Sequence, residues 1–517
     1  MHFFHILNTR LYQRFAVDTA LYFISFPLPL LTTIKKCDTI YRMKEEFFSN
    51  PLCERNFRMK HVDIKKIFAN VDEYVGKTID VCGWVRTTRD SKNVSFVEIN
   101  DGSCTANLQL VIDKENMDIK VNTAFVIGCG VKVTGVIVAS EMNKCEMQML
   151  SYEILGDCPA DYPLQKKRHS LEFLRTMPHL RVRTNTIMNV QRVRSALAAA
   201  SHLYFQSNGY TYVHTPLITG NDCEGGGEVF RVTTQPWNAT AKTAEEYFAE
   251  DFFGKQAFLT VSGQLEGEVA AMALGKIYTF GPVFRAENSN TSRHVSEFWQ
   301  VEPEVAFAEL PDIIEIIEEY IKFIVGYVLE NCSSEIDFFE KFFEKGLRQK
   351  LELLTSSDFQ VLEYTDAIEL LKKAEGANFA FAPEWGAELQ SEHERWLTDQ
   401  IFKKPVFVIN YPKDIKSFYM KQNDDGKTVA ATDLLVPGIG ELVGCSEREA
   451  NYDKLVAAME ARGMDVSAYS QYLDLRKYGS VPHSGFGIGF DRLVMYVTGV
   501  SNIRDVLLYP RTPKELK

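Results

Sequence analysis

Gly485-Phe486-Gly487-Ile488-Gly489-Phe490-Asp491-Arg492-Leu493 is the stretch that decides how this chain folds. Glycines at a strand end that leads into a helix, with an arginine in the first helical turn, suit the binding of a phosphate. Far upstream stand Phe284-Arg285-Ala286-Glu287, a polar loop, and then Glu297-Phe298-Trp299-Gln300. An arginine and a glutamate two residues apart on one strand place both side chains on the same face of a sheet. Each stretch alone says little, but together they favour a nucleotide site.

In this order and spacing, the two stretches resemble motifs 3 and 2 of the class II aminoacyl-tRNA synthetases. The resemblance runs from about Thr78 to Pro513 and is closest to subclass IIb, which contains the aspartyl, asparaginyl and lysyl enzymes. Within subclass IIb the chain is similar to the asparaginyl family. The strings that carry this similarity are Asn221-Asp222-Cys223-Glu224-Gly225, Thr260-Val261-Ser262-Gly263-Gln264-Leu265, Ala286-Glu287-Asn288-Ser289-Asn290-Thr291-Ser292-Arg293-His294, Val301-Glu302-Pro303-Glu304, Gly479-Ser480-Val481-Pro482-His483 and Ile503-Arg504-Asp505-Val506.

The resemblance implies a fold, a reaction and partners. The implied fold is an α+β catalytic domain built on an antiparallel sheet flanked by helices, preceded by an all-β OB-fold barrel. Asparagine and ATP would give asparaginyl-adenylate and pyrophosphate, and the asparaginyl group would pass to the 3′ end of tRNA(Asn) for protein synthesis. ATP as a substrate, Mg²⁺ and a homodimer are also implied. Two alternatives stay open: an aspartyl-type enzyme that charges tRNA(Asp) and tRNA(Asn), and a non-catalytic paralogue.

The bulk composition is that of a globular protein with two or more domains. The chain has 517 residues and is 45% hydrophobic and 24% charged. A net charge of −12 argues against a protein that coats nucleic acid non-specifically, although a local basic face suffices for one tRNA. Ten cysteines without a Cys-x-x-Cys pair disfavour a zinc site and fit a reducing compartment. No apolar run is long enough to span a membrane. We expect a cytoplasmic protein, or an organellar one if residues 1–58 are a targeting segment.

The chain is expected to divide into four parts. Residues 1–58 show no apolar periodicity and form an extension, which is either an organellar targeting segment or sequence upstream of the true start. Residues 59–157 show short alternating strands with turn signals and are predicted to be an OB-fold anticodon-binding domain rather than another small barrel. Residues 158–178 are a proline-containing hinge, and residues 179–517 are the catalytic domain.

Three segments of the catalytic region have clear patterns. Apolar residues from Ile187 to Tyr204 recur at helical spacing, and a strand over Tyr210–Pro216 follows. Together they resemble motif 1, which builds the dimer interface in class II synthetases. Leu310–Leu329 is predicted to be a core helix, and Val406–Pro412 a buried strand.

A basic stretch leads into the motif 1 helix, and it suits either a solvated surface or contact with RNA. Between Tyr162 and Arg194 the only acid is Glu172, and the basic residues are Lys166, Lys167, Arg168, Arg175, Arg181, Arg183, Arg192 and Arg194.

Activation of a carboxylic acid by ATP needs fixed cations, because negative charge develops on the phosphoryl oxygens in the transition state. The resemblance implies three catalytic residues, Arg285, Glu287 and Arg492. Arg285 would hold the α-phosphate and the substrate carboxylate, and Glu287 would position adenine. Arg492 would lie on one face of the adenine ring, near the γ-phosphate, with Phe298 stacked on the other face.

Four further residues of the nucleotide site follow from the same resemblance. Arg293 and His294 lie in the loop between the motif 2 strands, where the family has cationic contacts to the terminal phosphates. Glu441 matches the principal Mg²⁺ ligand, and Asp433 assists it.

The resemblance also implies an amino-acid pocket. Glu224, Gln264 and Glu302 would surround the α-ammonium group, and Arg448 would bind the side-chain carbonyl oxygen. Aspartyl enzymes carry a lysine where this chain has Gly267, so an aspartate carboxylate would lack a partner here, which favours asparagine. Asp491 departs from the glutamate common in asparaginyl enzymes, and we expect Asp491 to support the site without touching a substrate.

Three barrel residues match anticodon contacts of the family: Arg89, Phe96 and Gln109. An exposed aromatic ring that stacks on a base contributes about 1–3 kcal/mol. For Phe96 an alternative stays open, because a phenylalanine in a small barrel is equally suited to the core.

Overall fold

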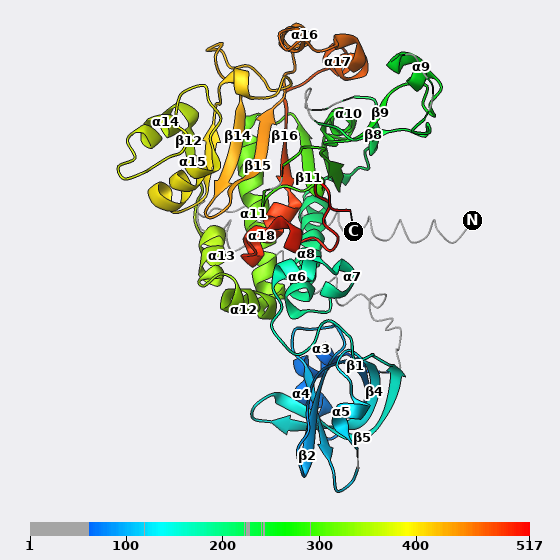
Figure 1. Ribbon diagram of the computed structural model, residues 1–517. Coiled ribbons are helices and arrows are strands. Elements are labelled where there is room, and N and C mark those ends of the chain that lie inside the picture. Colours follow the sequence, from blue (N-terminus) through cyan, green and yellow to red (C-terminus); the bar gives the residue numbers. More distant parts are fainter. Residues whose placement is uncertain are drawn as a thin grey trace, which may run out of the picture.

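The computed structural model describes residues 61–117, 119–221, 223, 228–238, 240, 243–289 and 291–516. The proposed extension, residues 1–58, lies outside the described residues. Figure 1 shows a small barrel at the bottom and a larger α+β body above it. None of the helices in the described ranges is long and apolar enough to cross a membrane.

The barrel confirms the predicted OB-type fold. Its five strands close in the order β1-β2-β3-β5-β4. The inner side chains alternate along each strand and include the fully buried Val81, Val97, Leu110 and Val133. The strands are β1 (Thr78–Arg89), β2 (Val94–Asn100), β3 (Leu108–Asp113), β4 (Gly130–Ser140) and β5 (Lys144–Gly156), with the short helices α3 (Ile64–Ala69), α4 (Val71–Tyr74) and α5 (Val121–Ala124).

The body is built on an eight-stranded sheet in the order β12-β13-β14-β15-β16-β11-β10-β6. All neighbouring pairs are antiparallel except β12 with β13 and β6 with β10, as the predicted catalytic fold requires. The strands are β6 (Thr211–Tyr212), β10 (Lys276–Phe284), β11 (Glu297–Ala306), β12 (Gln360–Glu363), β13 (Val406–Ile409), β14 (Ala431–Val436), β15 (Gly440–Glu447) and β16 (His483–Gly489). A second sheet has the order β7-β9-β8 and contains β7 (Ile218–Thr219), β8 (Arg231–Val232) and β9 (Ala257–Leu259).

Two long helices, α8 (Asn185–Ser207) and α11 (Leu310–Asn331), and the shorter α18 (Phe490–Thr498) cover one face of the large sheet and form the main core with it. The predicted core helix is α11. It begins with a reciprocal cap between Glu309 and Asp312, and Pro311 lies in its first turn, where the missing N–H costs no hydrogen bond. The opposite face of the sheet is left for the site.

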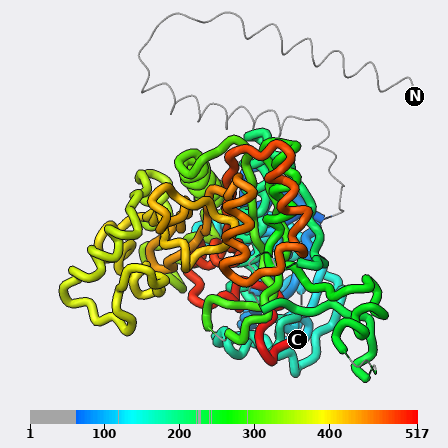
Figure 2. The backbone as a smooth tube through the Cα atoms, turned by 90° about the horizontal axis from the view of Figure 1, so that it is seen from above, coloured from blue at the N-terminus to red at the C-terminus, as the bar shows by residue number. Residues whose placement is uncertain are grey.

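The remaining helices lie around the sheet. In Figures 1 and 2 the segment with α14 and α15 (yellow) and the segment with α9 (green) lie on opposite sides of the body. These helices are α6 (Leu171–Arg175), α7 (Pro178–Arg181), α9 (Ala244–Ala249), α10 (Gln264–Leu274), α12 (Ser333–Phe342), α13 (Leu347–Ser356), α14 (Tyr364–Lys372), α15 (Ser391–Arg395), α16 (Tyr452–Glu460), α17 (Ser470–Lys477), the π-helix η1 (Trp396–Phe402) and the 3₁₀ helices η2 (Lys413–Ile415), η3 (Val466–Tyr469) and η4 (Ile503–Asp505).

Two predicted strands are shorter in the structure. The strand predicted over Tyr210–Pro216 pairs only as β6, because the chain leaves the edge of the sheet after Val213 N donates to Tyr278 O at 3.0 Å. β10 ends at Phe284, so Arg285 and Glu287 lie just beyond the strand and not on it. Arg285 N still donates to Ser296 O at 3.0 Å, but Ala286 N turns away to Glu228 O at 2.7 Å.

Half of the charges in the basic stretch are paired inside the protein, so neither a solvated surface nor contact with RNA describes this half. Arg175 Nε donates to Asp505 Oδ1 at 2.9 Å, and Arg181 Nη2 donates to the carbonyl oxygen of Arg504 at 2.8 Å. Arg192 and Arg194 are paired with Glu335 and Asp491. The exposed basic residues are Lys166, Lys167, Arg168 and Arg183.

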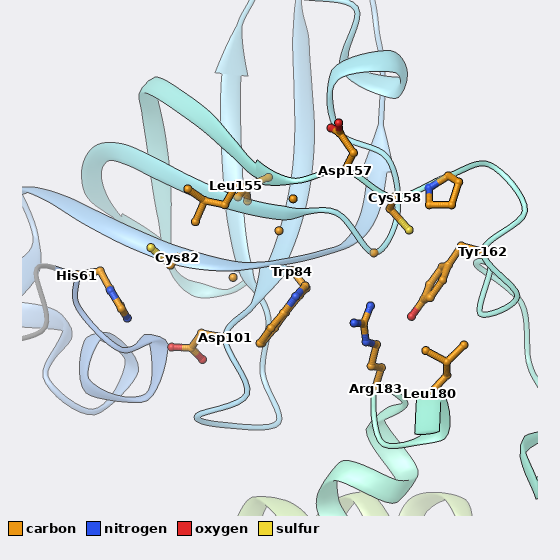
Figure 3. Close-up of a pocket in the computed structure, with 16 residues that line it drawn as sticks. His61, Cys82, Trp84, Asp101, Leu155, Asp157, Cys158, Tyr162, Leu180 and Arg183 are labelled. Atoms are coloured by element: carbon orange, nitrogen blue, oxygen red, sulfur yellow. The ribbon is translucent and has the colours of Figure 1, made fainter. Parts of the chain in front are cut away.

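Polar contacts join the barrel to the body. Arg86 Nη2 donates to Asn185 Oδ1 at 2.6 Å, and Thr105 Oγ1 donates to Asn189 Oδ1 at 2.9 Å. Beside these contacts, a cavity of about 640 Å³ lies between the barrel and residues 158–183. Figure 3 shows Trp84 of the barrel on one side of this cavity, with Tyr162 and Arg183 across from it.

The buried Arg181 generates a test of this architecture. Replacing Arg181 with alanine removes the partner of three carbonyl oxygens and of part of the Asp505 carboxylate. We expect the body to lose about 3–5 kcal/mol of stability, because three buried carbonyl oxygens lose their donor and Asp505 keeps only Arg175 as a charged partner. Calorimetric melting measures this, with the exposed Arg168→Ala as a control. Equal melting temperatures for the two variants would contradict the structural role of Arg181.

Candidate active site

The open face of the large sheet has a floor of alternating polar side chains and glycines. Its polar column is on β11 and consists of Gln300, Glu302 and Glu304, with the Phe298 ring before them, while the alternate residues Val301 and Val305 point into the helical core. β16 lies next to β11, and Gly489 and Gly485 pair with Gln300 and Glu304. A Cβ built on Gly485 would stand 2.2 Å from Glu304 Oε1. We call this strip beside the polar column, to which the glycines of β16 add no side chain, the trough.

Glu302 is fixed at the centre of this floor, as expected for a residue implied in binding an α-ammonium group. Its carboxylate accepts hydrogen bonds from Gly263 N at 3.1 Å, from Thr279 Oγ1 at 3.2 Å and from the hydroxyl of Ser262. Gln264, at the start of α10, donates from Nε2 to Glu268 Oε1 at 3.0 Å. A buried carboxylate with several donors is held in one orientation and is ready for a cation.

Arg448 directly follows β15, contacts Glu304 and is buried. Its guanidinium donates from Nε to Glu304 Oε2 at 3.2 Å and from Nη2 to Glu304 Oε1, and Nη1 donates to Ser446 Oγ at 2.7 Å. This forked pair fixes the plane of the guanidinium. Glu304 thus positions Arg448, a role that the sequence analysis did not assign.

A second buried group, which the sequence analysis missed, surrounds Glu268. Arg476 Nη2 donates to Glu268 Oε2 at 2.7 Å, and the Tyr472 hydroxyl donates to the same carboxylate at 2.9 Å. His483 faces Glu268 Oε2 at 2.9 Å through Nε2 and Val481 O at 2.8 Å through Nδ1, so both ring nitrogens need a hydrogen. Burial alone would raise the pKa of Glu268, but the charges of Arg476 and His483 more than offset it and hold the pKa below its usual value.

Gly267 borders this pocket on α10. A Cβ at this position would meet Ile277 Cδ1 at 3.5 Å and Glu304 Cγ at 3.6 Å, which is ordinary contact. A lysine at this position would therefore point toward Glu304 and bring a positive charge to the pocket. In this chain that charge is missing, and the guanidinium of Arg448 is already paired.

The nucleotide end of the floor gathers cations. The Arg285 guanidinium lies 5.5 Å from the centre of the Phe298 ring, and Arg492 Nη1 is 3.5 Å from Glu441 Oε2. The pKa of His294 is lowered, first by burial and then by the charge of Arg492. The pKa of Arg293 is also lowered, first by burial and then by the charge of the neighbouring Arg395. Such a cluster suits a polyphosphate.

Two carboxylates face the same point near these cations. A Cβ on Gly444 would stand 3.4 Å from Glu441 Oε1 and 3.8 Å from Asp433 Oδ1. The other oxygen of Asp433 accepts from Lys416 Nζ at 2.6 Å. In the described ranges no three or more His, Cys, Asp or Glu side chains form a ready metal cage. Two carboxylates nevertheless fit Mg²⁺, which proteins bind through one or two carboxylates and the phosphates of a nucleotide.

Asp491 lies behind the floor. Its carboxylate is buried, pairs with Arg194 and accepts from Trp299 N at 2.9 Å. Burial raises the pKa of Asp491, and Arg194 opposes this shift. The position agrees with the expectation that Asp491 supports the site without touching a substrate.

The residues implied in anticodon binding share one outer face of the barrel. Arg89 pairs with Phe96 across β1 and β2, and Gln109 pairs with Glu98, the next outward residue after Phe96. Arg89 is exposed, and Phe96 and Gln109 are half-buried. Phe96 points outward between the buried Ser95 and Val97, which does not support the core interpretation.

The structure thus places the implied ATP and amino-acid residues on or next to one face of the large sheet. Glu224 lies outside the described residues. Two of the residues that the sequence analysis missed could have been found from their spacing. Glu268 follows Gln264 by four positions on a helix, and Glu304 follows Glu302 by two positions on a strand, so each shares a face with a predicted residue. The sequence gives no such spacing for Arg476, because only the fold brings α17 to this pocket.

Comparisons with known proteins agree with this geometry. A family model described as "tRNA synthetases class II (D, K and N)" matches residues 170–513, and one described as "OB-fold nucleic acid binding domain" matches residues 79–155. Curated asparagine–tRNA ligases of Clostridium novyi and Alkaliphilus oremlandii are 51% and 52% identical, over 88% of this chain and 99% of their own length.

Solved structures show the same likeness. Asparaginyl-tRNA synthetase from Pyrococcus horikoshii complexed with asparaginyl-adenylate superposes with a TM-score of 0.77 at 32% identity, over 89% of this chain and all of that one. The Entamoeba histolytica asparaginyl-tRNA synthetase gives a TM-score of 0.74 at 29% identity, over 86% of this chain and 97% of that one. The chain belongs to the class II tRNA synthetases of the D, K and N group and, within them, to the asparagine–tRNA ligase family.

Proposed function

We propose that this chain activates asparagine with ATP to asparaginyl-adenylate and transfers the asparaginyl group to the 3′ end of tRNA(Asn). One observation carries the choice of asparagine. The pocket that faces the glycine trough holds Arg448, already paired with Glu304, and has no lysine at Gly267. Relatives at 51–52% identity over nearly their full length support the same assignment.

In the first step a carboxylate oxygen of asparagine attacks the α-phosphorus of ATP, and the bond to the β-phosphate oxygen breaks to release pyrophosphate. Arg285, at the end of β10, holds the α-phosphate and the carboxylate together. Arg492 and Arg293 offset the charge of the leaving group, and His294 contacts the terminal phosphates beside them in the motif 2 loop. Phe298 stacks on adenine and Glu287 positions it. Positioning and charge suffice for this displacement, so no protein nucleophile is invoked.

Glu441 and Asp433 are the residues that would hold Mg²⁺, and the ion would supply positive charge against the negative charge of the phosphates. Glu441 lies beside Arg492, so the nucleotide would meet both charges at the same end of the trough. Lys416 holds Asp433 in place from the other side.

Selectivity follows from the amino-acid end of the trough. Glu302, with Gln264 and Glu224, binds the α-ammonium group, and Arg448 donates to the side-chain carbonyl oxygen. An aspartate carboxylate would face Glu304 and Glu268 without an added cation. Unpaired buried charge of this kind discriminates strongly between substrates of the same shape.

The tRNA is bound at both ends of the molecule. Arg89, Phe96 and Gln109 read anticodon bases on the barrel, while the 3′ end enters the trough. We further propose a homodimer, supported by β6 at an open edge of the sheet and by exposed apolar side chains around it on Leu203, Leu217 and Ile218. Residues 1–58, 59–157, 158–178 and 179–517 are proposed as extension, anticodon-binding domain, hinge and catalytic domain, in a cytoplasmic protein.

Asparagine, and not aspartate, is expected to drive exchange of radiolabelled pyrophosphate into ATP. Gly267→Lys should lower kcat/KM for asparagine by more than about tenfold, because the new ammonium group pairs with Glu304 and loosens Arg448. Gly267→Ala, which adds only a methyl group in ordinary contact, is the matched control. Equal exchange with aspartate in the parent protein would refute the substrate assignment.

Arg285→Ala and Arg492→Ala are each expected to lower exchange at least about a hundredfold, since each removes a cation that acts on the phosphates. Sedimentation should show the same dimer as the parent, and Arg168→Ala should behave as the parent in both assays. Near-normal exchange in both variants would mean that ATP binds elsewhere.

Phe96→Ala is expected to lower tRNA charging by about 1–3 kcal/mol in kcat/KM, from the loss of base stacking, and to leave pyrophosphate exchange unchanged. Val97→Ala is the matched control, because Val97 points inward and its truncation should lower the melting temperature instead. A Phe96→Ala variant with a lowered melting temperature and a normal kcat/KM for tRNA charging would contradict the anticodon role of Phe96.

A further inference from the structure

The turn that leads from β14 into β15 spans residues 436–441 and ends at Glu441, the second residue of β15. One short segment holds this turn from outside. This segment, Ser391–Phe402, consists of α15 and the π-helix η1. Glu394 Oε2 accepts from Glu441 N at 3.2 Å, and Asp399 Oδ1 accepts from Gly438 N at 3.0 Å. Two carboxylates thus hold two backbone N–H groups of the turn, one of them on Glu441 itself.

The fit between Glu394 and the turn is close. Gly440 has a φ of +90°, and a Cβ at this position would stand 2.2 Å from Glu394 Oε2. Only glycine accepts both this backbone conformation and this contact. Gly438 has a φ of +80°, so the turn also needs a left-handed residue where Asp399 binds it. The turn is shaped to receive these two carboxylates.

The π-helix explains how both carboxylates reach the turn. Asp399 follows Glu394 by five residues, and in an uninterrupted α-helix such residues are about 140° apart around the axis. In a π-helix the hydrogen bonds join residues five apart, so the wider turn of η1 reduces this angle. A π-helix costs hydrogen-bond geometry and is found mostly at functional sites, which fits a segment with a positioning task.

The same segment contacts the motif 2 loop. Arg293 Nη1 donates to Ser391 Oγ at 3.4 Å, and its Nη2 donates to Gly438 O at 3.5 Å. The loop with the phosphate-binding cations and the turn with Glu441 therefore meet on α15. Burial, followed by the charge of Glu441, raises the pKa of Glu394 to about 7.

We infer that α15 and η1 form a clamp that sets the position of Glu441 for Mg²⁺, with Glu394 and Asp399 as its positioning residues. The inference rests on the proposed function, in which Glu441 binds the ion. Glu394 acts through its acceptor oxygen on Glu441 N. Its replacement by glutamine should therefore be mild, because an amide oxygen accepts the same hydrogen bond.

The test compares Glu394→Ala, Glu394→Gln, Asp399→Ala and Glu441→Gln in the full chain, with the exposed Glu388→Ala as the control. The first readout involves no turnover: the rise in melting temperature that ATP causes without asparagine, measured over a series of Mg²⁺ concentrations. The second is the Mg²⁺ concentration that gives half-maximal pyrophosphate exchange. Glu394→Ala should raise the half-saturating Mg²⁺ about tenfold in both readouts, and Glu394→Gln should stay within about twofold of the parent. Asp399→Ala should also raise the half-saturating Mg²⁺ concentration, and Glu388→Ala should match the parent.

Three outcomes would overturn the clamp. The first is a Mg²⁺ requirement of Glu394→Ala equal to that of Glu388→Ala while Glu441→Gln raises it. The second is a Glu394→Gln variant as impaired as Glu394→Ala, which would make the charge and not the hydrogen bond decisive. The third is a Glu441→Gln variant with an unchanged Mg²⁺ response, which would remove the metal assignment and the clamp together. Asparagine-dependent exchange in the parent protein tests the proposed function separately from all three.

Discussion

The site depends on one constraint: three alternate positions of β16 carry no side chain. Gly485, Gly487 and Gly489 leave the open face of β16 bare, between the polar column of β11 and the end of β15. The Glu304 carboxylate already occupies the space above Gly485, so any larger residue there would displace the partner of Arg448. The trough, the orientation of Arg448 and the packing of β16 against β11 follow from the same three glycines.

Buried charge is the second feature that organises the molecule. Three ion pairs are removed from water, and each makes several further hydrogen bonds. They are Glu304 with Arg448, Glu268 with Arg476, and Asp505 with Arg181. Such pairs contribute little net stability, because desolvation offsets their attraction, but they leave each side chain a single orientation. Rigid placement is what a site needs when its rate comes from aligned charges and not from a protein nucleophile.

The two ends of the body are supported in different ways. At the amino-acid end, buried side chains of α10, α17 and β16 pack around Glu268 and hold the pocket from below. At the nucleotide end, the cations and Glu441 are more exposed, and the support comes from the clamp segment and from Asp491 behind the sheet. The first arrangement suits discrimination between similar side chains, and the second suits a triphosphate that enters and leaves at each turnover.

The sequence by itself determined the features that depend on local pattern. Alternation in the barrel strands, the apolar period of α11 and the strand-to-helix junction at Gly489 each follow from neighbouring residues, and motif spacing pointed to Arg285, Glu302, Arg448 and Arg492. Only the tertiary structure decided which charges are internal. Arg181 meets Asp505, Arg194 meets Asp491 and Arg476 meets Glu268 across separations of more than two hundred residues. A basic residue looks the same in a sequence whether it meets solvent, RNA or a buried carboxylate, because its partner is chosen by the fold. The end of β10 at Phe284 and the contact of η1 with the Glu441 turn were hidden for the same reason: both depend on which distant backbone group offers a hydrogen bond.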